Sequence, residues 1–213
     1  MTNPRAITKL DHDRLHAVLT RMGEQGWTME HGNAILSKPK LAAVGLAAIQ
    51  VVLDQELVNS QSIGKVLLKS ESTEAIVSSM RPCTSIARLA KTLLGRMPNI
   101  DPRGAELVIM SVSQLGFADE ATEDEILAMA EERFGLKECS PWVAPALRNR
   151  TLRQPYGERL YLAMKPIFTP LGVDAIFTVI EVSDGNSLSA EEVTPATAFS
   201  PNSRFVFERV QKK

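Results

Sequence analysis

The chain has 213 residues, 44% hydrophobic and 23% charged, with a formal net charge of −1. These ordinary values exclude a wholly disordered chain, and the length allows one large domain or two small ones. The near-zero charge excludes the strong positive field of a dedicated nucleic-acid-binding protein. The two cysteines, Cys83 and Cys139, exclude a disulfide framework and a zinc site made of cysteines alone.

The sequence carries no secretion or membrane signal. Its first residues lack an apolar core of signal-peptide length. The longest apolar stretch, 41–53, is too short to cross a bilayer. We therefore expect a cytoplasmic protein without a membrane partner.

The first hundred residues are predicted to be helical. Leu15, Val18, Leu19 and Met22 follow helical spacing, and residues 40–57 are apolar on almost every face, as in the middle of a bundle. Residues 59–72 are polar at both ends and are predicted to be a connection. The expected helices cover residues 11–23, 28–36, 39–57, 73–80 and 84–97.

A boundary between two domains is predicted at residues 98–104. The segment PNIDPRG holds two prolines, one glycine, Asn99 and Asp101 within seven residues, which is typical of a break in regular structure. We therefore expect a helical domain over residues 1–100 and a second domain over residues 101–213.

The second domain is predicted to be α+β. Thr122 can cap a helix that ends before Gly135, and Ser140 with Pro141 can begin another to about residue 150. Residues 105–112 could form a buried strand or a short helix, and their β-branched content favours the strand. The other expected strands are 159–168, 175–182, 188–193 and 204–210. The predicted fold class is thus α+β: an N-terminal helical bundle, then a domain with two helices and a mostly antiparallel sheet.

Short motifs of the second domain resemble those of a known set of proteins. They are LGF (115–117), FGL (134–136), VAPALR (143–148), AM-x-PI (163–167) and RFVF (204–207). Over roughly residues 105–210 the chain is similar to a family of uncharacterised bacterial proteins found notably in candidate-phylum genomes. The resemblance implies a genuine bacterial domain, and it implies no activity, ligand or site residue.

Two small groups of residues could carry catalytic chemistry. His12 and His16 are four residues apart on one helix face, as zinc ligands are, but zinc needs a third protein ligand, for which Asp11 or His31 would have to be recruited. Cys139 lies near a predicted helix N-terminus, which can lower a thiol pKa, but all three histidines lie in the other half. We therefore expect neither a metal site nor a cofactor, and assign no catalytic residue.

A cluster of arginines is the candidate binding site. Between residues 133 and 165 there are seven basic and two acidic residues, with Trp142 and Tyr156 nearby for stacking. Guanidinium groups bind phosphates in a fork, and the two preceding helices have the outline of a helix-turn-helix. Against this, Pro145 would disturb the recognition helix, and the acidic run at 119–132 would repel a phosphate backbone. The candidate nucleic-acid-binding residues are Arg148, Arg150, Arg153 and Arg159.

The sequence therefore favours a non-catalytic binding or interaction module, nucleic-acid-binding or regulatory through the arginine cluster. One alternative is a protein–protein assembly module, a homodimer formed through the apolar helical half. The other is an enzyme of unknown reaction. The sequence has no Walker A loop, no G-x-G-x-x-G and no G-x-S-x-G motif.

Overall fold

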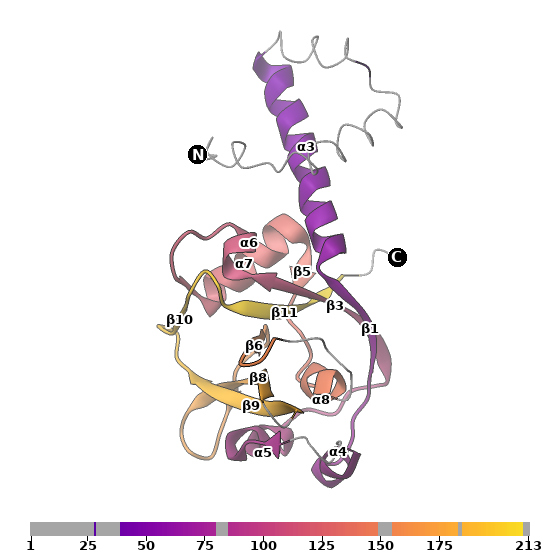
Figure 1. Cartoon of the computed structure of the whole chain (residues 1–213), viewed down its shortest axis with the longest axis vertical. Helices are drawn as coiled ribbons and strands as arrows, with labels where there is room; N and C mark the ends of the chain where they lie inside the picture. Colours follow the sequence, from indigo (N-terminus) through magenta and orange to yellow (C-terminus); the bar gives the residue numbers. More distant parts are fainter. Residues whose placement is uncertain (1–27, 29–38, 80–84, 149–154, 183–184, 211–213) are drawn as a thin grey trace. The chain divides into compact units, whose positions relative to one another are not determined.

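The structure is a computed structural model of the whole chain (Figure 1). It describes residues 28, 39–79, 85–148, 155–182 and 185–210. The chain divides into two compact units, residues 1–60 and 61–213. The helix predicted over 11–23 lies outside the described residues, as does all but Thr28 of the helix predicted over 28–36.

In the first unit the structure describes one long helix, α3 (Pro39–Ser60). It contains the apolar helix predicted over 39–57. Pro39 begins it, where a missing backbone N–H costs nothing because the first helical N–H groups have no intrahelical acceptor. Within the helix, Gln50 Nε2 donates to Asp54 Oδ1 at 2.8 Å, one turn away. None of the described helices combines the length and hydropathy needed to span a membrane.

The predicted N-terminal helical bundle is wrong. The segment expected to be a connection forms strand β1 (Ser62–Leu68), and it belongs to the main sheet. Two short helices, α4 (Thr73–Ser79) and α5 (Arg88–Leu94), follow with strand β2 (Ser85–Ile86) between them. All four elements lie in the second unit, so the predicted boundary at 98–104 falls inside that unit.

The second unit is built on a nine-stranded mixed sheet. Its main path is β1-β3-β11-β6-β8-β9-β2, with β5 beside β11 and β7 beside β8. Two pairs of the described strands are parallel, β11 with β6 and β2 with β9, and the other six pairs are antiparallel, so the sheet is mixed but mostly antiparallel. The remaining strands are β3 (Arg103–Ser111), β5 (Leu136–Lys137), β6 (Arg159–Leu162), β7 (Ile167–Phe168), β8 (Asp174–Val182), β9 (Gly185–Val193) and β11 (Arg204–Arg209). A separate two-stranded sheet joins β4 (Ala121–Thr122) to β10 (Ala198–Phe199).

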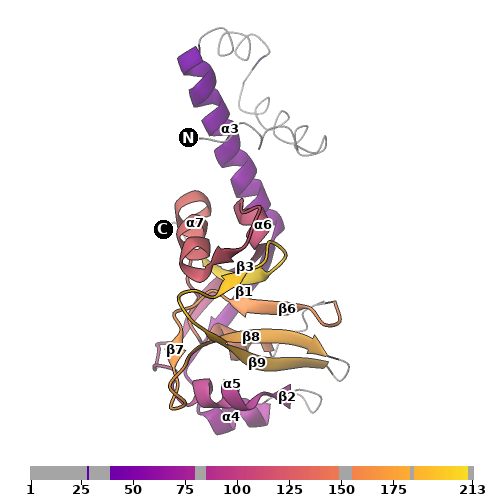
Figure 2. The same ribbon diagram turned by 90° about the vertical axis from the view of Figure 1, so that its left-hand side faces the viewer.

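Helices lie at both ends of this curved sheet. Helix α5 packs on β9 and β8, whereas α6 (Val112–Leu115) and α7 (Glu123–Phe134) lie at the opposite end, beside β3 (Figure 2). Helix α8 (Val143–Arg148) contacts β1, at one end of the strand order, and also β8 and β9, toward the other end (Figure 1). Trp142, Val143, Ala144 and Leu147 are therefore buried.

The capping signals of α7 are confirmed. The Thr122 hydroxyl accepts the Glu125 N–H at 3.4 Å, and Glu125 Oε2 accepts the Thr122 N–H at 2.9 Å, which completes a capping box. Gly135 ends the helix with φ 63°, a left-handed conformation that favours glycine. This helix has the predicted bounds because its signals are all local.

The core of the second unit lies on both faces of the central strands. In β3, four successive residues, Leu107 to Met110, are buried, and in β11 the run Phe205 to Phe207 is buried too. Continuous burial of this kind requires side chains packed on both sheet faces. In contrast, β1 lies at the end of the path and keeps Leu67 66% exposed.

Candidate functional site beside the edge strand

Strand β1 has one strand neighbour among the described residues. It pairs antiparallel with β3, with Lys65 opposite Glu106 and Leu67 opposite Gly104. An edge strand of this kind directs backbone N–H and C=O groups away from the sheet, where another extended chain can pair with them.

A groove of about 300 Å³ lies along this strand. Its floor is apolar and buried, and its rim carries charged or exposed side chains. Residues 65, 66 and 67 all line it, and successive residues of a strand point to opposite faces, so the groove runs along the strand edge. The lining residues are Lys65, Val66, Leu67, Lys69, Glu71, Ile76, Trp142, Pro145 and Ala146.

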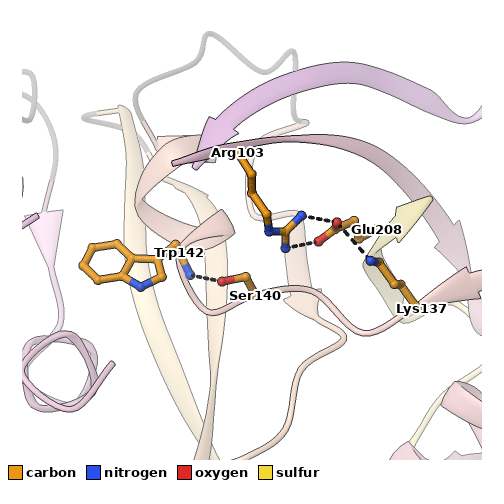
Figure 3. Close-up of polar contacts among 5 residues, drawn as sticks. All are labelled: Arg103, Lys137, Ser140, Trp142 and Glu208. Carbon is orange, nitrogen blue, oxygen red and sulfur yellow. Dashed lines mark hydrogen bonds and ion pairs between the residues drawn. The ribbon is translucent and has the colours of Figure 1, made fainter. Parts of the chain in front are cut away.

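The wall opposite β1 is held in place by Trp142 and α8. Trp142 Nε1 donates to the Pro98 carbonyl at 2.7 Å, and the Trp142 backbone N–H lies 3.4 Å from Ser140 Oγ (Figure 3). Pro145 is the third residue of α8, so its missing N–H falls in the first turn, where no intrahelical acceptor is available. The sequence-based objection that Pro145 would disturb this helix is therefore wrong.

The charges at the groove lie on its rim. Lys69 Nζ is 2.6 Å from Glu71 Oε1, and the Lys69 side chain remains 56% exposed. Lys65 is also exposed. The sequence does not predict this site, because residues 62–69 have no long apolar run and read as a connection. The signal that could have found it is the short apolar run from Val66 to Leu68 between two lysines, which is compatible with a strand.

A second cavity, of about 230 Å³, lies at the start of α7. Burial raises the pKa of the Glu123 carboxyl to about 7, and the charges of Asp124 and Glu138 add to this effect. Glu123 Oε1 is buried, and no described residue forms a hydrogen bond with it. Lys165 and Asp174 also line the cavity. No group of three or more His, Cys, Asp or Glu side chains among the described residues could hold a metal ion.

The predicted arginine cluster is described only in part. Arg159, on β6, forms an ion pair with Glu191 of β9. Arg148 ends α8, whereas Arg150 and Arg153 lie outside the described residues. Pairing with Glu191 uses part of the charge that Arg159 could offer to a phosphate. The nucleic-acid-binding interpretation stays a prediction.

Of the two candidate sources of catalytic chemistry, the structure describes only Cys139. His12, His16 and His31 lie outside the described residues. Cys139 is 4% exposed, and its thiol donates to the Val206 carbonyl at 3.2 Å. Burial raises the pKa of the Cys139 thiol well above its ordinary value, and the negative charge of Glu208 raises it further. A buried, protonated thiol is a poor nucleophile.

Comparison with known proteins gives no further identification. No protein-family model matches the chain, and neither a curated protein nor a solved structure matches it. The function is therefore inferred from the geometry of the chain itself.

Proposed function

We propose that the chain is a binding module that captures an extended segment of a partner protein by adding it as a strand to β1. The observation that carries this proposal is the groove along the strand edge, which three successive residues of β1 line. Backbone hydrogen bonds to the edge would supply affinity, and side chains in the groove would supply selectivity.

The arrangement of strand and helix supports this proposal. One wall of the groove is the edge strand β1 and the other is formed by Trp142 with α8, which packs against β1, so an extended chain added to the edge of β1 would lie along the groove. Ligand pockets for drug-sized molecules occupy about 300–1,000 Å³. A groove of about 300 Å³ is at the lower limit of that range, which suits a few side chains better than a large cofactor.

The chemistry of the groove favours binding over catalysis. Of its described lining residues, the titratable ones are Lys65, Lys69 and Glu71, all at the rim. Serine, cysteine and histidine are absent from this lining, so it offers no nucleophile and base of the usual kind.

The proposal is tested by selecting peptides on the immobilised full chain from a displayed library of random peptides. Ala146→Trp fills the groove from α8, and Ala128→Trp, on the exposed side of α7, is the matched control. We expect enriched peptides that bind the unaltered chain and A128W but not A146W. Bound peptide should also slow hydrogen exchange of the β1 amides.

A second variant distinguishes loss of binding from loss of the fold in A146W. Leu67→Asp changes a side chain that is 66% exposed, so it should leave the melting temperature nearly unchanged and still weaken peptide binding. The proposal fails if no peptide is enriched. It also fails if the enriched peptides bind A146W and L67D as tightly as the unaltered chain.

A further inference from the structure

The outward face of β1 carries a fixed pattern of charge. Lys65, Leu67 and Lys69 are all exposed. Lys65 and Leu67 are two residues apart in β1, so their side chains lie on the same face of the strand. Lys69 comes directly after the end of β1 and continues this alternation. The outward side chains of an added strand would lie next to these three residues.

Side chains directly opposite one another on neighbouring strands interact most strongly. Strands in a sheet are about 4.8 Å apart, so an added strand would lie one spacing from Lys65 and two spacings from Glu106 on β3. The charges that such a strand meets on this face are thus those of the two lysines, together with that of Glu71 beside Lys69. Lys69 already contacts Glu71, but exposed ion pairs are weak, so this contact leaves Lys69 able to accept a second carboxylate.

The opposite face of the added strand would meet the apolar floor of the groove. Val66, Ile76, Trp142 and Pro145 form this floor and are buried. Two residues of the incoming segment, those flanking its central position, would point toward this floor. They should be apolar because a buried polar side chain without a partner is costly.

On the basis of the proposed function, we infer that the groove takes a segment of another protein in which two acidic residues flank three apolar ones. The acidic residues lie opposite Lys65 and Lys69, the central apolar residue lies opposite Leu67, and the two others face the groove floor. Glu-Val-Leu-Val-Glu is the simplest sequence of this class.

A second copy of this chain is a poor occupant of the same edge. A symmetric pair of β1 strands is antiparallel, and pairing centred on Leu67 would place Lys65 of each copy opposite Lys69 of the other. Like charges directly opposite on neighbouring strands are destabilising. Lysines on an edge strand therefore disfavour self-pairing while they attract an acidic segment.

The test measures the binding of three labelled peptides to the full chain by fluorescence anisotropy. The peptides share Gly-Ser ends and differ only at two positions: Glu-Val-Leu-Val-Glu, Gln-Val-Leu-Val-Gln and Lys-Val-Leu-Val-Lys. The variant K65E/K69E reverses the charge of the strand. The control K91E/K165E makes the same change in net charge on α5 and beside β7, at exposed lysines outside the groove.

We expect the acidic peptide to bind the unaltered chain at least about tenfold more tightly than the basic one, since two opposed charge pairs change sign. K65E/K69E should reverse this order, and K91E/K165E should preserve it. If the Glu and Gln peptides bind equally well and A146W blocks both, the inferred preference for acidic residues is wrong, but peptide binding in the groove is supported. Failure of all three peptides to bind would overturn this inference. Failure of the random-library selection as well would overturn the proposed function.

Discussion

Arg103 and Glu208 form a two-pronged ion pair between the neighbouring strands β3 and β11 (Figure 3). Arg103 Nη2 donates to Oε2 at 2.8 Å, Nη1 donates to Oε1, and Lys137 Nζ lies 3.4 Å from Oε1. Glu208 is 3% exposed. Burial raises the pKa of its carboxyl, but the hydrogen bond and charge of Arg103, with those of Lys137, outweigh burial and hold the pKa below its ordinary value.

Replacing Arg103 with alanine should destabilise the protein strongly. The change leaves a buried carboxylate with Lys137 as its remaining described cationic partner, and breaking a buried pair in this way costs about 3 kcal/mol. Arg209→Ala is the control, because the carboxylate of its partner Glu106 is 22% exposed against 4% for Glu208, and pairs with a more solvated carboxylate are worth up to about 1 kcal/mol. Urea unfolding measures both variants, and an equal loss in the two would show that burial of Glu208 adds nothing.

Glu123→Gln should change how stability depends on pH. The Glu123 pKa rises from 4.5 to about 7 on folding, so the folded state binds its proton more tightly than the unfolded state. The free energy of unfolding should therefore decrease as the pH rises from about 4.5 to about 7.

The E123Q variant should be more stable than the unaltered chain at pH 8 and nearly equal to it at pH 5. Allowing for solvent screening of a half-buried carboxyl, we expect a gain of roughly 1–2 kcal/mol at pH 8. Thermal unfolding at the two pH values measures the effect. Glu131→Gln, on the exposed side of α7, is the control, and a pH dependence identical in E123Q and E131Q would contradict the assignment.

The Cys139 thiol should resist alkylation in the folded protein. It is buried, its pKa is raised, and its proton is donated to the Val206 carbonyl. The measurement uses Cys83→Ala, which leaves Cys139 as the chain's single cysteine. Iodoacetamide should label this variant in urea and leave it unlabelled without urea over the same time. Labelling of the folded variant at the rate of a free thiol would restore Cys139 as a candidate nucleophile.

Removing the two lysines of β1 should promote self-association. In K65T/K69T the like charges that oppose antiparallel pairing of two β1 strands are gone, and threonine suits an exposed strand face. Light scattering should show a larger mass for K65T/K69T than for the control K91T/K165T. Equal masses at the same protein concentration would show that these lysines do not protect the edge.

The sequence predicts elements well where the signals are local. The helix from Glu123 to Phe134 is one example, since its cap, its capping-box partner and its terminal glycine lie within or next to it. The predicted strand at 105–112 is confirmed as β3, because four buried apolar residues in succession favour a central strand. The helix predicted over 73–80 is confirmed as α4, with the Ser72 hydroxyl accepting the Ala75 N–H at 3.1 Å.

Prediction fails where an element depends on a distant partner. Strand β1 contains Gly64 and Lys65, which have low strand propensity, and it is stabilised by pairing with β3, about forty residues away. Helical spacing over 84–97 likewise gives no indication that residues 85–86 join β9, a hundred residues away. The candidate groove was missed for the same reason, since its walls come from β1 and from Trp142 with α8.

The position of β11 has a consequence for how the protein is made. This strand is the last one described along the chain, yet it lies inside the sheet, between β3 and β6. While the chain emerges from the ribosome, β3 and β6 lack the neighbour that joins them until residues 204–209 have appeared. The second unit can therefore complete its sheet only after residue 204 has emerged, and a nascent chain that stalls before it would present two apolar strand edges to chaperones and proteases.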